Sequence, residues 1–183
     1  MVMINSGFHK IVWEFLLSCL QVRINGGHVE ENQRQIIVAS PWISDLSNTN
    51  LILNTPLYHG VQVNVRRRLS SLSNVLITLV EEGFEVVVVT SRPGCSKWKS
   101  DWEGKSMERD RNLQDLWSRK GLNIIHDPKS HVKSISTPVG VISGSANLTD
   151  NGFFRNIEHM MVTELNESGF AQARHVVREL IQK

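Results

Sequence analysis

The sequence predicts a single α/β domain in which a mixed β-sheet is flanked by helices. Two short runs of mostly β-branched residues, 35–40 (QIIVAS) and 85–90 (EVVVVT), have the length and composition of buried strands. The segment between them, 69–83, carries leucine and valine on one helical face and ends in glycine, as a crossover helix between parallel strands does. Helical and strand patterns alternate along the chain, which is typical of the α/β class.

The N-terminal segment predicts a helix. Apolar residues recur at helical spacing over 9–20, and Asn25-Gly26-Gly27 ends the pattern. Glu14 interrupts the apolar run and no small-residue cleavage site follows it, so we expect a helix rather than a secretion signal. We assign 1–34 to this helix and a linker, and 35–183 to the α/β core that completes one domain, 1–183.

The C-terminal half predicts a long loop followed by further strands and helices. Residues 91–111 are polar and lack an apolar period, which indicates an exposed loop. A short helix at 112–120 and a strand at 122–126 follow. The runs 131–136 and 139–143 flank Thr137-Pro138 and predict a hairpin. We expect a last strand at 158–163 and a closing amphipathic helix at 170–181.

The composition is compatible with several kinds of binding partner and does not indicate any one of them. The 183 residues are 40% apolar and 21% charged, which is typical of a compact domain. The formal net charge of +2 allows contact with a polyanion but is too small to indicate one. Cys19 and Cys95 give neither a disulfide framework nor a metal-binding spacing, and no apolar run has the length of a membrane span. We therefore expect a soluble, cytoplasmic protein without stable membrane association.

Polar residues at strand spacing form the candidate site. Alternate side chains of a strand share a face, so His131 and Lys133 in HVK point together, as do Ser145 and Asn147 in GSAN if that segment is extended. Cleavage of a phosphodiester needs a nucleophile or base, donors for the nonbridging oxygens and an acid for the leaving group. Histidine, lysine, serine and asparagine supply these without a metal. Glu158 is a candidate to hold one nitrogen of an imidazole.

Three segments together resemble the signature of the phospholipase D superfamily. They are HVK at 131–133, GSANLT at 144–149 and NIEHMMV at 156–162, and the run IIVASPWISD at 36–45 is also similar. The resemblance is greatest to short members with a single HxK motif, namely a bacterial endonuclease type and the catalytic domains of metal-independent restriction enzymes. It implies a phospholipase D-like fold and metal-independent phosphodiester hydrolysis that uses no cofactor.

The resemblance also implies a role for each matched residue. His131 attacks phosphorus and forms a phosphohistidine, while Lys133 and Asn147 bind the phosphate oxygens. Ser145 assists, and Glu158 orients His131. Because the chain has one HxK motif and no internal repeat, a homodimer would supply the second histidine that the two-step mechanism needs. A partner protein carrying the other half of the site is the less economical alternative.

The sequence departs from the family pattern at one position. The usual aspartate five residues after the lysine is Pro138 here, and the hairpin is about one residue shorter than usual. An inactive nucleic-acid-binding or assembly module of the same fold therefore remains an alternative. Glu158 could also be a strand-edge charge that pairs with Arg155.

Two basic segments are candidates for binding the substrate, which we expect to be nucleic acid. Lys97, Trp98, Lys99 and Trp102 combine cations with aromatic rings, a mixture suited to phosphate neutralisation and base stacking. The triplet Arg66, Arg67 and Arg68 could follow a phosphate backbone, or could simply begin the next helix. Cleavage of a phospholipid is the alternative enzymatic reaction. The choice between DNA and RNA, the strandedness and any sequence preference stay open.

Overall fold

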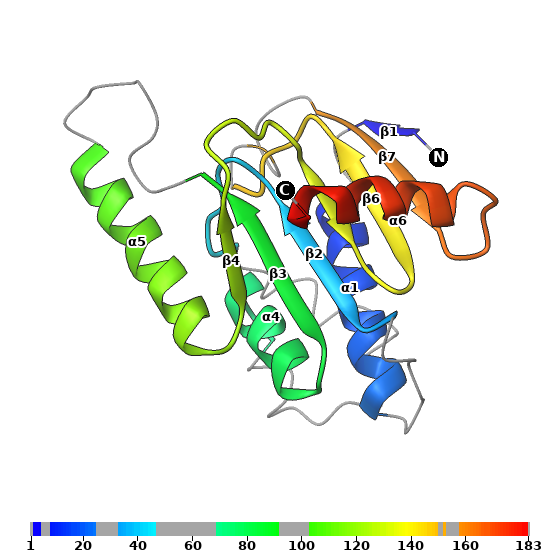
Figure 1. Cartoon of the computed structure of the whole chain (residues 1–183), viewed down its shortest axis with the longest axis horizontal. Coiled ribbons are helices and arrows are strands. Elements are labelled where there is room, and N and C mark those ends of the chain that lie inside the picture. The colour runs from blue at the N-terminus through cyan, green and yellow to red at the C-terminus, as the bar shows by residue number, and fades with distance from the viewer. Residues whose placement is uncertain are drawn as a thin grey trace.

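A computed structural model gives the structure of the chain and describes residues 2–4, 8–24, 33–46, 69–91, 103–149, 152 and 158–182. It confirms the predicted α/β class, with a mixed sheet flanked by helices. The sheet has seven strands within the described residues, in the order β1-β7-β6-β5-β2-β3-β4. In Figure 1, α6 crosses one face of the sheet while α1 and α4 cover the other.

The strands combine a parallel half with an antiparallel half. The strands β2, β3 and β4 are parallel neighbours, whereas β5, β6, β7 and β1 follow β2 in antiparallel succession. The predicted β-α-β unit and the predicted hairpin are therefore both confirmed. The bounds are β1 (Val2–Ile4), β2 (Gln35–Ala39), β3 (Glu85–Thr90), β4 (Asn123–His126), β5 (Ser134–Ser136), β6 (Gly140–Gly144) and β7 (His159–Glu164).

The inner positions of the central strands, 36–39 in β2 and 86–89 in β3, are all apolar because helices cover both faces of these strands. Ile36 and Val38 of β2 belong to the core cluster that includes α1 and α4, whereas Ile37 and Ala39 pack in the cluster on the α6 side. The helices are α1 (Phe8–Ile24), α4 (Leu72–Glu81), α5 (Glu103–Arg119) and α6 (Phe170–Arg178), which a 3₁₀ turn, η4 (Glu179–Ile181), extends.

The predicted loop at 91–111 is wrong from residue 103 onward, because α5 begins there rather than at 112. The side chains of Glu108, Arg109 and Arg111 are exposed, so this part of the helix presents no apolar stripe from which a sequence pattern could predict it. The second half is fixed by Trp117, which is fully buried and donates from Nε1 to Ser73 Oγ of α4 at 2.8 Å.

The predicted strand at 131–136 begins only at Ser134, so His131, Val132 and Lys133 lie before β5. On the side facing β2, the last pair of residues is Ala39 with Ser134. Beyond Ala39 the chain reaches Pro41, which lacks the N–H that would continue a ladder. The strand predicted at 158–163 likewise begins one residue later, at His159.

Candidate active site

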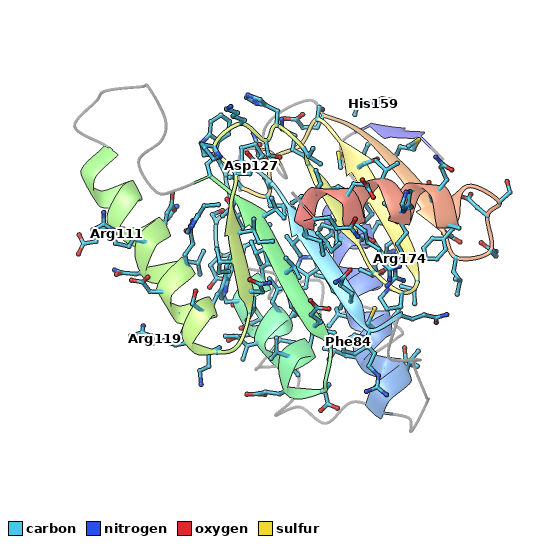
Figure 2. The ribbon with its side chains drawn as sticks, viewed as in Figure 1. Phe84, Arg111, Arg119, Asp127, His159 and Arg174 are labelled. Carbon is cyan, nitrogen blue, oxygen red and sulfur yellow. The ribbon has the colours of Figure 1, made fainter. Side chains whose placement is uncertain are left out.

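The predicted site residues lie at one end of the sheet. Because β5 and β7 run opposite to β2 while β6 runs parallel to it, the carboxyl ends of β2, β3 and β6 share this end with the start of β5 and of β7. Ligands of open α/β sheets bind outside the carboxyl ends of the parallel strands. Figure 2 shows Asp127 and His159 at this end and Phe84 at the opposite one.

A tight turn between β4 and the HVK segment carries the chain to His131. The N–H of Asp127 donates to Thr90 O at the end of β3, at 3.0 Å. The Asp127 carboxylate accepts from Lys129 N at 2.9 Å, and Asp127 O accepts from Ser130 N at 3.2 Å. These bonds close an Asx turn, so the residues that precede His131 have a fixed path.

The HVK segment presents its polar residues next to one another. His131 is exposed, and Lys133 is half-buried. Val132 between them packs into the cluster on the α6 side of the sheet. Lys133 Nζ donates to His131 O at 2.9 Å, so the ammonium group lies against the backbone of the histidine. Lys133 O accepts from Gly144 N at 3.1 Å, which joins the HVK segment to the GSAN segment.

The GSAN segment is joined in turn to the start of β7. Ser145 Oγ donates to Glu158 Oε2 at 2.5 Å, a short hydrogen bond typical of a hydroxyl that meets a carboxylate. The same oxygen accepts from His159 N at 3.0 Å, and Ser145 N donates to His159 O at 3.0 Å. Ser145 therefore helps to hold the Glu158 carboxylate at the start of β7.

Asn147 lies in a segment that the chain after β2 holds from the other side. Leu148 N donates to Ser40 Oγ at 3.1 Å, and Ser44 N donates to Leu148 O at 2.8 Å. Asn147 itself is half-buried, and its Oδ1 has no hydrogen-bond partner among the described residues. Gly152 approaches so closely that a Cβ there would collide with Asn147 O, so this contact requires glycine.

Pro138, at the position of the expected aspartate, lies away from these residues. It belongs to the turn between β5 and β6, at the opposite end of the hairpin from His131. The turn is closed by Thr137, whose Oγ1 donates to Gly140 O at 2.9 Å. Arg174 of α6 donates from Nη1 to Thr137 O at 3.2 Å. The departure from the family pattern therefore affects the turn and not the surroundings of His131.

The structure thus brings together His131, Lys133, Ser145, Asn147 and Glu158 at one end of the sheet. Within this group, the Glu158 carboxylate accepts a hydrogen bond from Ser145. The proposed substrate-binding residues lie outside the part of the chain that the structure describes, as does Arg155; they are Lys97, Trp98, Lys99, Trp102, Arg66, Arg67 and Arg68.

Two supporting residues were missed by the sequence analysis. Asp127 precedes Pro128 in a turn-forming run, DPKS, and this signal could have identified its role in the turn. Ser40 gave no such signal, because its hydroxyl serves Leu148, which lies 108 positions further along the chain.

Neither a metal centre nor a membrane-spanning helix is found in the described residues. No group of three or more histidine, cysteine, aspartate or glutamate side chains within these ranges is placed to hold a metal ion. Within the same ranges, every helix is too short or too polar to cross a bilayer.

Comparisons with known proteins support the fold. No protein-family model and no curated protein matches the chain. Among solved structures, the phospholipase D family member Nuc from Salmonella typhimurium matches with a TM-score of 0.51 and 14% sequence identity, over 100% of this chain and 90% of that one. NucT from Helicobacter pylori matches with a TM-score of 0.45 and 12% identity, over 100% and 94% of the two chains. The likeness to Nuc confirms the phospholipase D-like fold that the motifs predicted.

Proposed function

We propose that this protein is a metal-independent phosphodiesterase that cleaves nucleic acid, with His131 as its nucleophile. One observation carries the proposal: the HVK segment, the GSAN segment and Glu158 are joined in sequence by hydrogen bonds at the carboxyl end of the parallel strands. The fold is shared with Nuc, which is described as a phospholipase D family member. Residues with the chemistry of phosphoryl transfer therefore lie together on a fold of that type.

His131 would act in two steps. One imidazole nitrogen attacks phosphorus, a P–N bond forms, and the bond from phosphorus to the leaving oxygen breaks while an acid protonates that oxygen. In the second step the group that gave its proton takes one from water, the water oxygen attacks phosphorus, the P–N bond to His131 breaks, and the phosphate product leaves. The exposure of His131 supports this role, because an attacking nitrogen has to reach a polymer backbone.

Lys133 and Asn147 would bind the nonbridging oxygens of the phosphate. An ammonium group has three N–H donors, and that of Lys133 uses one to bind His131 O. This bond keeps the positive charge of Lys133 beside the proposed nucleophile. A cation held at that place stabilises the negative charge that develops on the phosphoryl oxygens. Asn147 would contribute its amide N–H groups from the neighbouring segment.

Glu158 would orient the imidazole of His131, and Ser145 would keep the glutamate in position. A carboxylate that accepts from one imidazole nitrogen leaves the other nitrogen with its lone pair, which is the form that can attack. The bond from Ser145 Oγ to Glu158 supports this arrangement, because it restricts the carboxylate to the start of β7.

The acid for the first step would come from a second subunit. One chain has one HxK motif, so a two-fold dimer that brings two copies of His131 into a shared site would supply both a nucleophile and an acid. Basic residues at 66–68 and 97–102 would contribute to binding the polyanion.

The alternative, non-enzymatic function is that of an inactive nucleic-acid-binding or assembly module. Pro138 is the feature that raises it, because the usual pattern has an aspartate there. Its place in the turn between β5 and β6 favours activity, since this turn and the HVK segment lie at opposite ends of the hairpin.

The test is incubation of the purified protein with labelled single- and double-stranded DNA and RNA in excess EDTA, with phospholipid vesicles as a parallel substrate. We expect cleavage of at least one nucleic acid and no release of phospholipid headgroup. His131→Ala protein, prepared in the same way, is the control for contaminating nucleases. Nucleic-acid binding without cleavage would favour the inactive module, and activity that EDTA removes and Mg²⁺ restores would contradict this site.

A further inference from the structure

Trp42 is a large aromatic residue that stands exposed at the active-site end of the sheet. Its relative exposure is 47%, whereas Pro41 before it and Ile43 after it are buried. An exposed tryptophan leaves an extensive apolar ring in water, so its position calls for an explanation. The proposed mechanism does not involve the Trp42 ring.

The backbone on either side of Trp42 is firmly anchored. Pro41 O accepts from Thr90 Oγ1 and from Ser91 N, each at 3.2 Å, which ties the segment to β3. Ile43 forms a parallel bridge with Leu148. Trp42 O accepts from Ser40 Oγ at 2.7 Å. The ring is thus presented from a fixed backbone rather than from a free loop.

The same anchors connect the Trp42 segment to the segments that carry the proposed reacting groups. The hydroxyl of Ser40 that donates to Trp42 O also accepts from Leu148 N, the residue next to Asn147. On the other side, Ala39 pairs with Ser134, the residue next to Lys133. The chain at Trp42 is therefore connected, through Ser40 and Ala39, to the neighbours of both segments that would hold the phosphate.

We propose that the Trp42 ring stacks on a nucleobase adjacent to the scissile phosphate, so that the site selects single-stranded nucleic acid. This inference rests on the proposed function and names its substrate class. A base can lie flat on an indole only if its face is not covered by a neighbouring base, which a duplex does not allow without local unstacking. An aromatic ring near phosphate-binding groups would contact the base of a nucleotide while those groups bind its phosphate.

The experiment compares two substrates that differ only in their bases. One is a short fluorescent single-stranded DNA, and the other has abasic residues on both sides of the scissile linkage. The steady-state KM and kcat of the wild-type, Trp42→Ala and Trp42→Phe proteins are measured on both in EDTA. Leu165→Ala is the matched control, because Leu165 is an apolar residue that is 58% exposed and follows the far end of β7.

We expect Trp42→Ala to raise KM for the base-bearing substrate by about 5- to 150-fold, the range that corresponds to the loss of one stacked base. It should leave KM for the abasic substrate unchanged. Trp42→Phe should retain most of the wild-type KM, and Leu165→Ala should match the wild-type protein on both substrates. Unchanged KM values in Trp42→Ala, or equal losses on both substrates, would overturn the inference.

Two further readouts separate this inference from the proposed function. If the wild-type protein cleaves neither substrate, the proposed function fails, and fluorescence anisotropy with the same two oligonucleotides then decides the inference. Tighter wild-type binding to the base-bearing strand, lost in Trp42→Ala, would uphold stacking without cleavage, and equal binding would refute it. A Trp42→Ala protein that sediments as a monomer while the wild-type protein is a dimer would instead assign the ring to a subunit interface and overturn the proposal.

Discussion

The two ends of the β5–β6 hairpin are built in different ways. At the HVK end, exposed and half-buried polar side chains are held by hydrogen bonds between separate segments, such as Ser145 with Glu158. At the turn end, Thr137 and Gly140 are buried against α1 and α6, and Arg174 donates to backbone carbonyls there. This difference predicts that activity and stability depend on different ends of the hairpin. Substitutions at the HVK end should lower the cleavage rate with little effect on stability. Substitutions at the turn end should lower stability with little effect on the cleavage rate per folded molecule.

The largest expected effect tests the first half of this comparison. His131→Ala should lower the rate of cleavage by about 10³-fold or more, because it removes the proposed nucleophile. Because the side chain is exposed, the free energy of unfolding should change by less than about 0.5 kcal/mol. Single-turnover cleavage in EDTA and denaturant unfolding measure the two quantities. A mutant that cleaves at the wild-type rate would remove His131 from the mechanism.

Arg174→Met tests the other end of the hairpin. Arg174 is 6% exposed and donates to Thr137 O, Gln33 O and Gln35 O at 2.8–3.2 Å. A methionine would leave buried carbonyls without donors, so we expect a loss of about 1–3 kcal/mol in unfolding free energy, measured by urea titration.

Arg119→Met is the matched control for this substitution, because Arg119 is exposed near the end of α5; Figure 2 labels both arginines. It should leave stability unchanged. The cleavage rate per folded molecule should be the same in both variants. A loss of cleavage in Arg174→Met that exceeds the loss of folded protein would show that the two ends of the hairpin are not independent.

The pH dependence of the unfolding free energy tests the contribution of the buried groups at the turn end. Burial raises the pKa of the Cys19 thiol to about 12. The folded protein therefore keeps this proton above pH 9, where the unfolded chain releases it. Stability should be fully present below pH 9 and should fall by about 1.4 kcal/mol for each unit above it. Burial also lowers the pKa of Arg174 to about 10, which opposes this trend above pH 10.

The measurement is urea unfolding between pH 9 and 10, compared for the wild-type and Cys19→Ala proteins. In this interval the stability difference between the two should shrink with pH, since alanine has no proton to release. Parallel pH profiles would mean that the Cys19 thiol does not titrate differently in the folded and unfolded states.

The smallest expected effect tests whether a second subunit contributes its His131 to the site at the HVK end. If each site uses His131 from two subunits, a mixed pair of wild-type and His131→Ala chains should be nearly inactive. With equal amounts of the two chains and free exchange, activity should fall to about one quarter of that of the undiluted wild-type protein, rather than to one half. A linear loss across the titration, or full activity in a protein that sediments as a monomer, would show that one chain carries a complete site.

The sequence predicted the strands that are buried on both faces of the sheet. The runs at 35–40 and 85–90 contain β2 and β3, whose inner positions 36–39 and 86–89 are all apolar because helices cover both faces. The start of α5 could not be predicted, because the run 103–111 is mostly polar in sequence and Glu108, Arg109 and Arg111 are exposed. The strand β1 could not be predicted either, since its three residues are a strand only through pairing with β7.

The residues of the candidate site were predicted from their motifs, but not the way in which they are joined. The bond between Ser145 and Glu158 depends on the register of β6 against β7, in which Gly144 pairs with Met160. Register is a tertiary property that spacing along the chain does not contain. The support of Asn147 by the segment after β2 is of the same kind, because it depends on contacts between distant parts of the chain.

The short strand β1 also bears on how this protein behaves at high concentration. It pairs with the first half of the outer edge of β7, from His159 to Met161, in a six-residue strand that also contains Val162. An uncovered edge of that length and composition is a template for strands of other molecules, whereas a three-residue edge offers few open hydrogen-bonding groups. We therefore expect that removing residues 2–4 would expose the edge of β7 beside the candidate site and raise the tendency of the protein to aggregate.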